Sequence, residues 1–276
     1  MGLEQTIRKI ENLEIQGATD VAIEGVKALR KEYRKDVSEE ELEKAAEKLK
    51  NSRPTEPALF NALEYVLTSK DFKGALKHFD RSQKSISKNG LVKFRDAEAI
   101  YTHCHSDTVV GIIEKVAGKK DLKVHNTETR PLYQGRTTAK KMSNKNIDIT
   151  HYIDSAARFA LEKSDYMLIG ADAVNRKGDV YNKIGSRLIA ESAEEMNVPV
   201  FVCTDSWKYF DGEEIEIEMR DGKEVWEDKP EEVSIRNPAF EKIPSRLIDG
   251  LVTEIGVVSP ISFESNVRDA YPDIFE

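Results

Sequence analysis

The second half of the chain alternates short apolar runs with segments of helical spacing, and a polar residue ends nearly every run. Strands that alternate with helices in this way form a parallel sheet with helices packed on it. Ligands bind beyond the carboxyl ends of such strands, so these polar residues are expected to converge on one site. The runs are AIYTHC, LKVHNTE, DITHYID, YMLIGAD and PVFVCTD, and they end at Cys104, Glu128, Asp154, Asp172 and Asp205.

The first third of the chain shows only helical patterns. Apolar residues recur at helical spacing over residues 3–16, where Gly17 predicts a stop, and again over residues 20–33. Ser38 and Glu41 form a capping box, which predicts the start of a third helix. This part of the chain is therefore expected to be helical throughout.

Two further helices are predicted before the sheet begins. One follows the break at Arg53, and the other runs from about Lys73 to Lys88 and ends at Asn89-Gly90. We expect a smaller all-helical domain over residues 1–92 and a larger domain over residues 93–276. The larger one is predicted to be a Rossmann-like, doubly wound parallel α/β domain.

The acidic segment over residues 211–233 allows two interpretations. An Asp221-Gly222 turn between EIEIEM and KEVWE is typical of a hairpin at the periphery. The same composition is typical of a solvated excursion, which we favour. A last strand is predicted over residues 251–258, where it would close the sheet.

The composition narrows the choice of partners. A net charge of −8 and a charged fraction of 33% argue against nucleic acid, although a local basic pocket can still hold phosphate. No apolar run approaches the roughly 20 residues that span a bilayer, and the first residues lack the apolar core of a signal peptide. We expect a cytoplasmic protein without membrane contact, in which Cys104 and Cys203 remain free thiols.

Cys104 has the most distinctive chemistry among the polar strand ends. It lies between a predicted strand and a predicted helix, where the positive end of the helix dipole lowers the pKa of a thiol. Such a cysteine acts as a nucleophile or base, and the alternative is a buried structural cysteine. His103 and His105 flank it, but no third and fourth ligand with recognisable spacing follows. We therefore predict no metal.

Two strand-to-helix turns are typical of anion sites. In the first, Arg130, Gln134 and Gly135 combine a guanidinium with a glycine that allows close approach and with free amides at a helix start. Asn182 and Lys183 belong to a second turn of this kind, and two turns suit a substrate phosphorylated at both ends. The alternative for the first turn is an ordinary tight turn with a surface arginine. The glycine patterns of nucleotide loops are missing, so no cofactor is predicted.

The carboxylate of Asp172 directly follows an apolar strand and two small residues. Such a carboxylate is costly to bury unless it is hydrogen-bonded or catalytic. Together with Cys104 it would form a pair of groups that move protons. Asp154 is expected to cap the following helix, and Asp205 to cap a helix or pair with Lys208.

Several motifs resemble the signatures of one superfamily, in the same order along nearly the whole chain. They are THCHS, ETRPLYQGRTTA, DSA, GADAV with NKIGS, and RNPAF, together with Arg53-Pro54-Thr55 and Asn61-Ala62 in the helical part. The superfamily contains sugar-phosphate isomerases and regulatory subunits of translation initiation factor 2B. The archaeal ribose 1,5-bisphosphate isomerases are most similar, and methylthioribose 1-phosphate isomerases are the near alternative.

The resemblance implies an aldose–ketose isomerase of nucleotide degradation, with Cys104 and Asp172 as its catalytic pair. The non-catalytic initiation factor subunits generally lack this pair, and they remain the alternative from another functional class. The resemblance also implies a phosphorylated pentose as substrate, a nucleoside monophosphate as a possible activator, and homo-oligomers built from dimers, such as hexamers. The residues it assigns to substrate binding are Gln16, Gly17, Ala18, Arg53, Arg130, Gln134, Gly135, Asn182, Lys183 and Lys208.

One position departs from the pattern of the isomerases. They usually carry an R-G-A-G or R-G-A-P turn whose arginine contacts substrate phosphate, whereas this chain has Gln16-Gly17-Ala18-Thr19. Losing a charge-assisted contact weakens binding by about 1.5–3 kcal/mol. Either another cation compensates for the missing arginine or the substrate differs.

Overall fold

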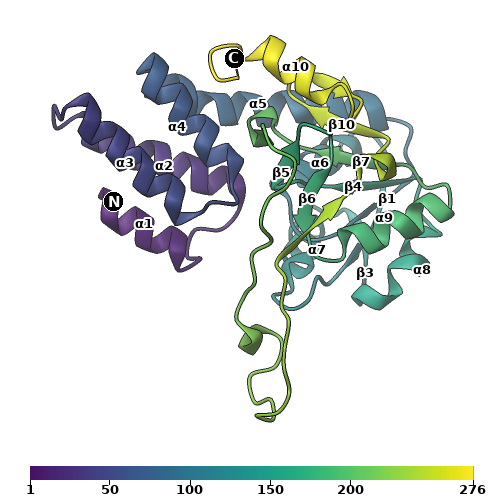
Figure 1. Cartoon of the computed structure of the whole chain (residues 1–276). Coiled ribbons are helices and arrows are strands. Elements are labelled where there is room, and N and C mark those ends of the chain that lie inside the picture. Colours follow the sequence, from purple (N-terminus) through teal and green to yellow (C-terminus); the bar gives the residue numbers. More distant parts are fainter. Residues whose placement is uncertain (276) are drawn as a thin grey trace.

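The first third of the molecule is a bundle of helices, as predicted (Figure 1). The structure is a computed structural model that describes residues 1–275. The capping box forms: the Glu41 amide donates to the Ser38 hydroxyl, and the Ser38 amide donates to the Glu41 carboxylate. None of the described helices has the length and apolarity to cross a membrane. The helices of this part are α1 (Leu3–Glu11), α2 (Ala18–Tyr33), α3 (Glu39–Ser52), α4 (Pro57–Ser69) and α5 (Phe72–Phe94).

Two predicted helix ends are wrong. Helix α1 ends at Glu11 rather than at residue 16, and Gly17 begins α2 instead, with a φ of +85° that favours glycine. Helix α5 continues through Asn89 and Gly90 to Phe94. A Cβ at Gly90 would lie 2.6 Å from the side chain of Ile112, so this glycine allows α5 to pack closely on α6 (Asp107–Ala117).

The second part of the molecule is built on a seven-stranded sheet in the order β11-β10-β7-β4-β1-β2-β3. All neighbouring strands are parallel except β10 and β11, so the predicted Rossmann-like sheet is confirmed. The single last strand predicted over residues 251–258 is instead an antiparallel pair. The strands are β1 (Ala99–Thr102), β2 (Lys123–Thr127), β3 (Asp148–Tyr152), β4 (Tyr166–Ile169), β7 (Val200–Cys203), β10 (Gly250–Thr253) and β11 (Gly256–Val258).

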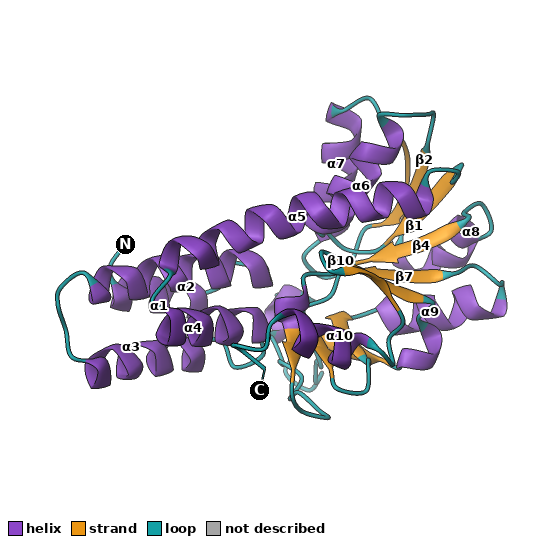
Figure 2. Ribbon diagram, turned by 90° about the horizontal axis from the view of Figure 1, so that it is seen from above, coloured by secondary structure: helices purple, strands orange, loops and turns teal. Residues whose placement is uncertain are grey.

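Both faces of this sheet are covered, which explains why β1, β7 and β10 are buried at every position. Helices α5 and α6 lie along one face (Figure 2), where Ile100 and Leu168 of the sheet pack against Ile86 and Ile112. On the other face, the sheet packs against α8, α9 and α10 through a second apolar cluster. The remaining helices are α7 (Gln134–Asn144), α8 (Ala157–Leu161), α9 (Ser186–Glu195) and α10 (Phe263–Ala270).

A second, four-stranded sheet in the order β8-β5-β6-β9 was not predicted. It forms from the chain that leaves the large sheet after β4 and from the chain after β7. The beginning of β5 follows Asp172, and the end of β6 carries Asn182 and Lys183, so both lie near the carboxyl ends of the large sheet. Its strands are β5 (Ala173–Asn175), β6 (Val180–Lys183), β8 (Tyr209–Phe210) and β9 (Phe240–Ile243).

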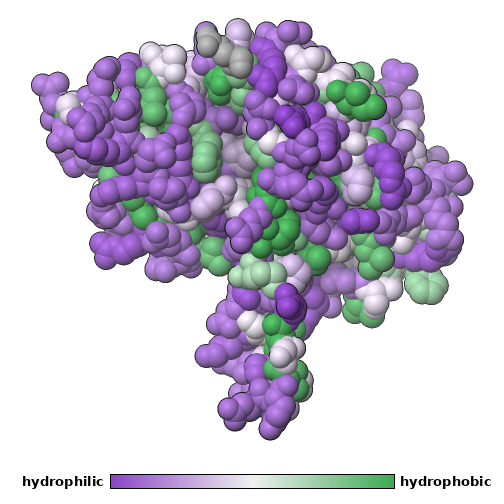
Figure 3. Space-filling view, in the orientation of Figure 1, coloured by the Kyte–Doolittle hydropathy of each residue, from purple (hydrophilic) through white to green (hydrophobic). Residues whose placement is uncertain are grey.

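Residues 211–239, here called the arm, connect β8 to β9 and project from the body of the molecule (Figure 1). EIEIEM and KEVWE do not pair with each other in the described structure, so the segment is an excursion rather than a hairpin. Its surface is mostly hydrophilic with small apolar patches (Figure 3), and Met219 and Trp226 are exposed.

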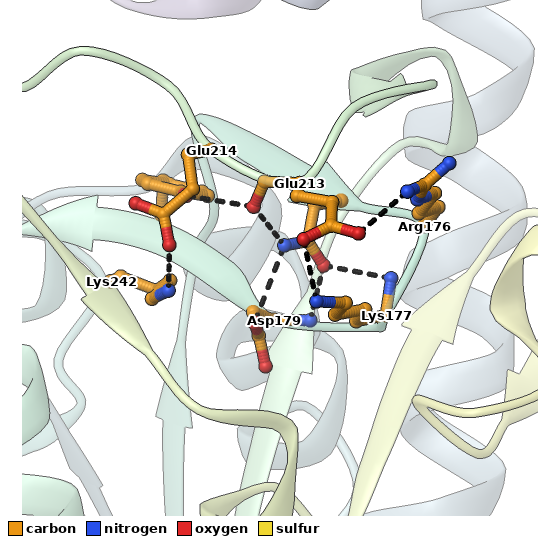
Figure 4. A network of polar contacts seen from close by, with 8 residues as sticks. Arg176, Lys177, Asp179, Glu213, Glu214 and Lys242 are labelled. Atoms are coloured by element: carbon orange, nitrogen blue, oxygen red, sulfur yellow. Dashed lines mark hydrogen bonds and ion pairs between the residues drawn. The ribbon is translucent and has the colours of Figure 1, made fainter.

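Ion pairs hold the beginning of the arm to the smaller sheet (Figure 4). The Glu213 carboxylate accepts from Arg176 at 2.6 Å and from Lys177 at 2.7 Å, and Lys242 donates to Glu214 at 2.6 Å. The side-chain amide of Asn175 also donates to the backbone carbonyl of Glu213 at 2.7 Å. Glu213 and Glu214, at the beginning of the arm, are therefore held against the smaller sheet.

Trp207 connects the two parts of the molecule. It follows β7 in the chain, yet its side chain is buried in the apolar core of the helical part. The ring of His78 stacks on it with centroids 3.8 Å apart. The side-chain amide of Asn61 donates to the backbone carbonyls of Trp207 and Tyr209, each at 2.7 Å. These contacts fix the helical part over the carboxyl ends of the strands.

Candidate active site

A cavity of about 300 Å³ lies where the helical part, the carboxyl ends of the large sheet and the base of the arm meet. A larger open hollow at the opposite edge of the sheet, near Lys120 and Asp148, contains none of the predicted site residues. The polar and charged residues around the smaller cavity include Gln16, Arg53, Glu56, Cys104, Gln134, Asp172, Asn182, Lys183, Lys208 and Arg220.

Only two of the five polar strand ends line this cavity, namely Cys104 and Asp172. The expectation that all five converge is therefore wrong. Glu128 pairs with Arg136 at 3.2 Å outside the cavity. Parallel strands do end at one edge, but the seven-stranded sheet is broad, and each strand end has its own neighbours.

The other two of these polar residues, Asp154 and Asp205, accept hydrogen bonds from backbone amides. Asp154 does not cap the following helix as predicted; its carboxylate accepts from the amides of Thr129 and Arg130, each at 2.7 Å. Asp205 does cap the short helix that follows it, since it accepts from the Trp207 amide at 2.8 Å. Its ion pair is with His78 at 3.0 Å rather than with Lys208.

Cys104 has a left-handed backbone with a φ of +69°, which is uncommon for residues other than glycine. Threonine side chains hold this conformation from both sides. The Cys104 amide donates to the Thr129 hydroxyl at 2.9 Å, and the Thr138 hydroxyl donates to the Cys104 carbonyl at 2.9 Å. The position of the thiol at the cavity is thus fixed by its backbone.

The thiol of Cys104 does not have the lowered pKa that the sequence predicted. Burial raises its pKa to about 11, and the charge of Lys183 only partly opposes this. The helix α6 begins at Asp107 and is capped by the side chain of Ser106, so Cys104 lies outside the first turn, where the helix dipole acts. In the free protein near neutral pH the thiol is therefore protonated.

Asp172 lies at the end of β4 and is surrounded by cations. Burial raises the pKa of its carboxyl group, while Lys208, Lys183 and Arg53 lower it. The Lys208 ammonium donates to the Ala171 carbonyl at 2.6 Å, which holds it beside this carboxylate. The negative charge of Asp172 also contributes to the raised pKa of Cys104, so the two groups are electrostatically coupled.

Most residues predicted to bind substrate line the cavity, including Gly17, Ala18, Asn182 and Lys183. Asn182 donates to the Ser186 hydroxyl at 2.8 Å, and burial lowers the pKa of Lys183. The carbonyl oxygen of the Gln134 side chain is buried and has no partner among the described residues, so it can accept from a ligand.

Arg130 and Gly135 do not line the cavity, although both were predicted to bind substrate. The Arg130 guanidinium donates to the Tyr133 hydroxyl and, at 3.1 Å, to the Val225 carbonyl in the arm. A Cβ at Gly135 would lie 1.8 Å from the Thr127 carbonyl oxygen, so this glycine allows α7 to pack on β2. In this structure both residues shape the turn and its contact with the arm.

Gln16 is exposed and its amide nitrogen donates to the Leu13 carbonyl at 2.9 Å. It lines the cavity but adds no charge there. The charges that the sequence reasoning missed are those of Glu56, Glu218 and Arg220. Only Glu56 stands near a quoted motif, directly after Arg53-Pro54-Thr55, and the other two belong to the arm.

Two groups of residues carry side chains of the kinds that bind metals. The first is His103 and His105 on either side of Cys104, and the second is His78, Asp205 and Glu254. Both ring nitrogens of His103 are hydrogen-bonded, to the Thr127 hydroxyl at 2.7 Å and to the Ile184 carbonyl at 2.9 Å. The ligand atoms of His78, Asp205 and Glu254 lie within 4.8 Å of one another. In this second group His78 is hydrogen-bonded to Asp205 at 3.0 Å, and Glu254 accepts from the Ser206 amide and the Tyr271 hydroxyl.

The chain is similar to known proteins over most of its length. The sequence pattern of the initiation factor 2 subunit family matches residues 14–260. Ribose 1,5-bisphosphate isomerase of Methanocaldococcus jannaschii is 37% identical over 94% of this chain and 92% of that protein. Methylthioribose-1-phosphate isomerase of Acetivibrio thermocellus is 30% identical over 94% of this chain and 88% of that protein.

A solved structure shows the same fold. The translation initiation factor eIF-2B of Pyrococcus horikoshii superposes with a TM-score of 0.84 over 94% of this chain and 97% of that chain, at 24% identity. At this identity the likeness concerns the arrangement of helices and strands. It supports the Rossmann-like sheet and the helical part that precedes it.

Proposed function

Because this chain belongs to the initiation factor 2 subunit family and is 37% identical to a ribose 1,5-bisphosphate isomerase, we propose that it converts ribose 1,5-bisphosphate into ribulose 1,5-bisphosphate. The named relatives support an isomerase. The observation that carries the proposal is a single cavity that contains Cys104 and Asp172 together with cations. A thiol and a carboxyl group can move protons, and cations can hold phosphate.

The reaction requires the sugar ring to open and a hydrogen to move from carbon 2 to carbon 1. The reacting form of the pair is the one in which its single proton is on Asp172 rather than on Cys104. The thiolate of Cys104 then removes the proton from carbon 2 as the bond between carbon 1 and the ring oxygen breaks. The carboxylic acid of Asp172 protonates the departing ring oxygen, which leaves an enol with a double bond between carbons 1 and 2.

The second half of the reaction restores both groups. The thiol of Cys104 returns its proton to carbon 1, and the carboxylate of Asp172 accepts the proton of the hydroxyl group on carbon 2. The product is a ketone at carbon 2, with phosphate retained on carbon 1. The neighbouring cations Lys183 and Lys208 hold the charged groups of substrate in place, and Lys183 also favours the thiolate when it forms.

The active pair carries one proton in this mechanism, which sets the expected pH dependence. Burial raises the pKa of Cys104 to about 11 and also raises that of Asp172. Between these two values the pair holds one proton, so kcat/KM is expected to be highest there. It should fall below the pKa of Asp172 and again above about pH 11. A decline that begins near pH 8 would contradict this assignment.

The test of the proposed function follows product formation by NMR. Purified protein is incubated separately with ribose 1,5-bisphosphate and with methylthioribose 1-phosphate, each with and without a nucleoside monophosphate. We expect the ketose from the first sugar. Conversion of the second sugar alone would assign the activity of the other relatives, and tight binding to initiation factor 2 without any ketose would indicate a regulatory subunit.

Substitution tests the catalytic pair. Cys104→Ser and Asp172→Asn are each expected to lower kcat by a factor of about 10³ or more, because each removes an acid–base group. Circular dichroism and thermal unfolding should remain near those of the unaltered protein. Turnover close to normal in either variant would overturn the assignment.

The partners predicted from the resemblance form part of the same proposal. We expect homo-oligomers built from dimers and activation by a nucleoside monophosphate. Light scattering measures the mass in solution, and initial rates with and without the nucleotide measure activation. A monomer at micromolar concentration would contradict the first expectation, and unchanged rates the second.

A further inference from the structure

The base of the arm brings a cation into the wall of the catalytic cavity. Arg220 belongs to the acidic segment whose composition indicates a solvated excursion, yet its side chain is only 7% exposed. It lines the same cavity as Cys104 and Asp172. A buried arginine beside a catalytic pair has to be held in place and needs a function that justifies its desolvation.

Glu218 holds Arg220 and Arg53 side by side. One oxygen of its carboxylate accepts from Nε of Arg220 at 3.1 Å, and the other accepts from Nη2 of Arg53 at 3.1 Å. The two guanidinium groups come from segments far apart in the sequence, one from the arm and one from the junction of α3 and α4. A single carboxylate thus orients both.

The backbone around Arg220 is also fixed. Its amide donates to the Asn237 carbonyl at 2.9 Å, and the Ala239 amide donates to the Glu218 carbonyl at 2.9 Å. The buried side chain of Asn237 donates to the Asp221 carbonyl at 2.9 Å and ties the turn that follows. Arg220 is therefore positioned by a short antiparallel ladder at the base of the arm.

Both guanidinium groups retain unused donors. Among the described residues, Nε and Nη1 of Arg53 and Nη1 of Arg220 are buried without a hydrogen-bond partner. Nη1 of Arg220 approaches Glu224 only to 4.0 Å, which is an ion pair beyond hydrogen-bonding distance. Buried donors are nearly always satisfied in native proteins, so these nitrogens indicate a ligand with several acceptor oxygens.

We propose that Arg220 binds a phosphate group of the substrate together with Arg53, and that the arm thereby completes the substrate site. A guanidinium presents its donors in a planar fork that matches phosphate oxygens. Arg220 also supplies a charge to the same cavity, in which Gln16 supplies none. This inference rests on the proposed function for the identity of the sugar, but its claim concerns the phosphate.

The kinetic test compares Arg220→Met with Lys229→Met, which removes an exposed cation farther along the same arm. With ribose 1,5-bisphosphate, Arg220→Met is expected to raise KM by about 10- to 100-fold while kcat changes less than threefold, because a binding contact is lost. Lys229→Met should leave both constants unchanged. An unchanged KM in Arg220→Met, or a loss confined to kcat, would overturn the inference.

Two further measurements separate this inference from misfolding and from the proposed function. Arg220→Lys keeps the charge and loses the fork, so its KM should lie between those of the unaltered protein and Arg220→Met. Calorimetric titration with inorganic phosphate needs no turnover. If the unaltered protein binds phosphate and Arg220→Met binds it at least tenfold more weakly, the phosphate site stands even where ribose 1,5-bisphosphate is not converted. Equal phosphate affinities in the two proteins would overturn it.

Discussion

Two buried polar clusters lie between the helical part and the α/β part of the molecule, and they use their hydrogen-bonding groups differently. In the first, His78 bonds to Asp205 at 3.0 Å and Glu254 accepts from the Tyr271 hydroxyl at 2.9 Å. Burial raises the pKa of Asp205, but the charge and hydrogen bond of His78 outweigh it and lower that pKa. The carboxylates of this cluster therefore find their partners within the protein.

The second cluster, at the cavity, consists of Arg53, Glu56, Glu218 and Arg220. Glu218 bridges the two arginines, but three guanidinium nitrogens and one oxygen of Glu56 are buried without a partner among the described residues. A buried ionic group is stable only when it is paired, so this cluster is complete only with a ligand. Substitutions should accordingly change stability in the first cluster and substrate affinity in the second.

The largest effect is expected from breaking the first cluster. His78→Ala removes both the partner of Asp205 and the ring stacked on Trp207, and an unpaired buried charge costs about 3–5 kcal/mol. The free energy of unfolding, measured with urea, should fall by that amount, while KM of the folded protein stays within a factor of two. Lys84→Ala, at an exposed position of α5, is the control. A loss below 1 kcal/mol would remove the distinction between the clusters.

Glu218→Gln tests whether the cluster at the cavity affects substrate affinity. Both arginines lose a charged anchor, so KM for the bisphosphate is expected to rise about tenfold with little change in kcat. Glu216→Gln, on the exposed surface of the arm, should behave as the unaltered protein. A change in kcat alone would place Glu218 with the proton-transfer groups instead.

Glu56→Gln tests how the cavity cluster affects stability. Burial, followed by the charge of Asp172, raises the pKa of Glu56 from 4.5 to about 8. The folded protein then binds this proton more tightly than the unfolded chain, so stability from this group falls as pH rises from 4.5 towards 8. Glutamine has no proton to lose. Relative to the unaltered protein, the variant should gain about 3–4 kcal/mol between pH 5 and pH 8; equal curves would exclude a protonated Glu56.

Gln16→Arg is expected to have the smallest effect. Gln16 lies at the rim and its amide is engaged with Leu13, so an arginine there would add a charge in a partly solvated place. KM should fall about threefold, since exposed charge pairs contribute 1 kcal/mol or less. In the Arg220→Met background the gain should be larger. A rise in KM would show that the cavity does not accept charge at this position.

Local signals in the sequence predicted a large part of this structure. The capping box at Ser38 depends on residues three apart, and the alternation of strands and helices depends on short-range periodicity. Cys104 and Asp172 were predicted at the carboxyl ends of strands from the sequence pattern alone, and both line the cavity. These features need no knowledge of which distant segments meet.

The features that could not be predicted depend on contacts between distant segments. Arg220 belongs to a polar stretch, and its place at the cavity depends on the pairing of residues 218–220 with residues 237–239 at the base of the arm. The pKa of Cys104 was predicted with the wrong sign because a helix start is visible in the sequence, whereas the burial that outweighs it is not. Asp154 likewise binds backbone amides from the turn after β2 rather than its own helix.

Helix α5 has a consequence for how a ligand can enter. It runs without a break over 23 residues, from the core of the helical part to the face of the large sheet (Figure 2). A continuous helix resists bending, so we expect the two parts to keep their relative position while a ligand enters. Entry would then depend on local opening of the arm. We expect amide hydrogens of residues 213–237 to exchange with solvent much faster than those of α5, and equal protection would argue against this route.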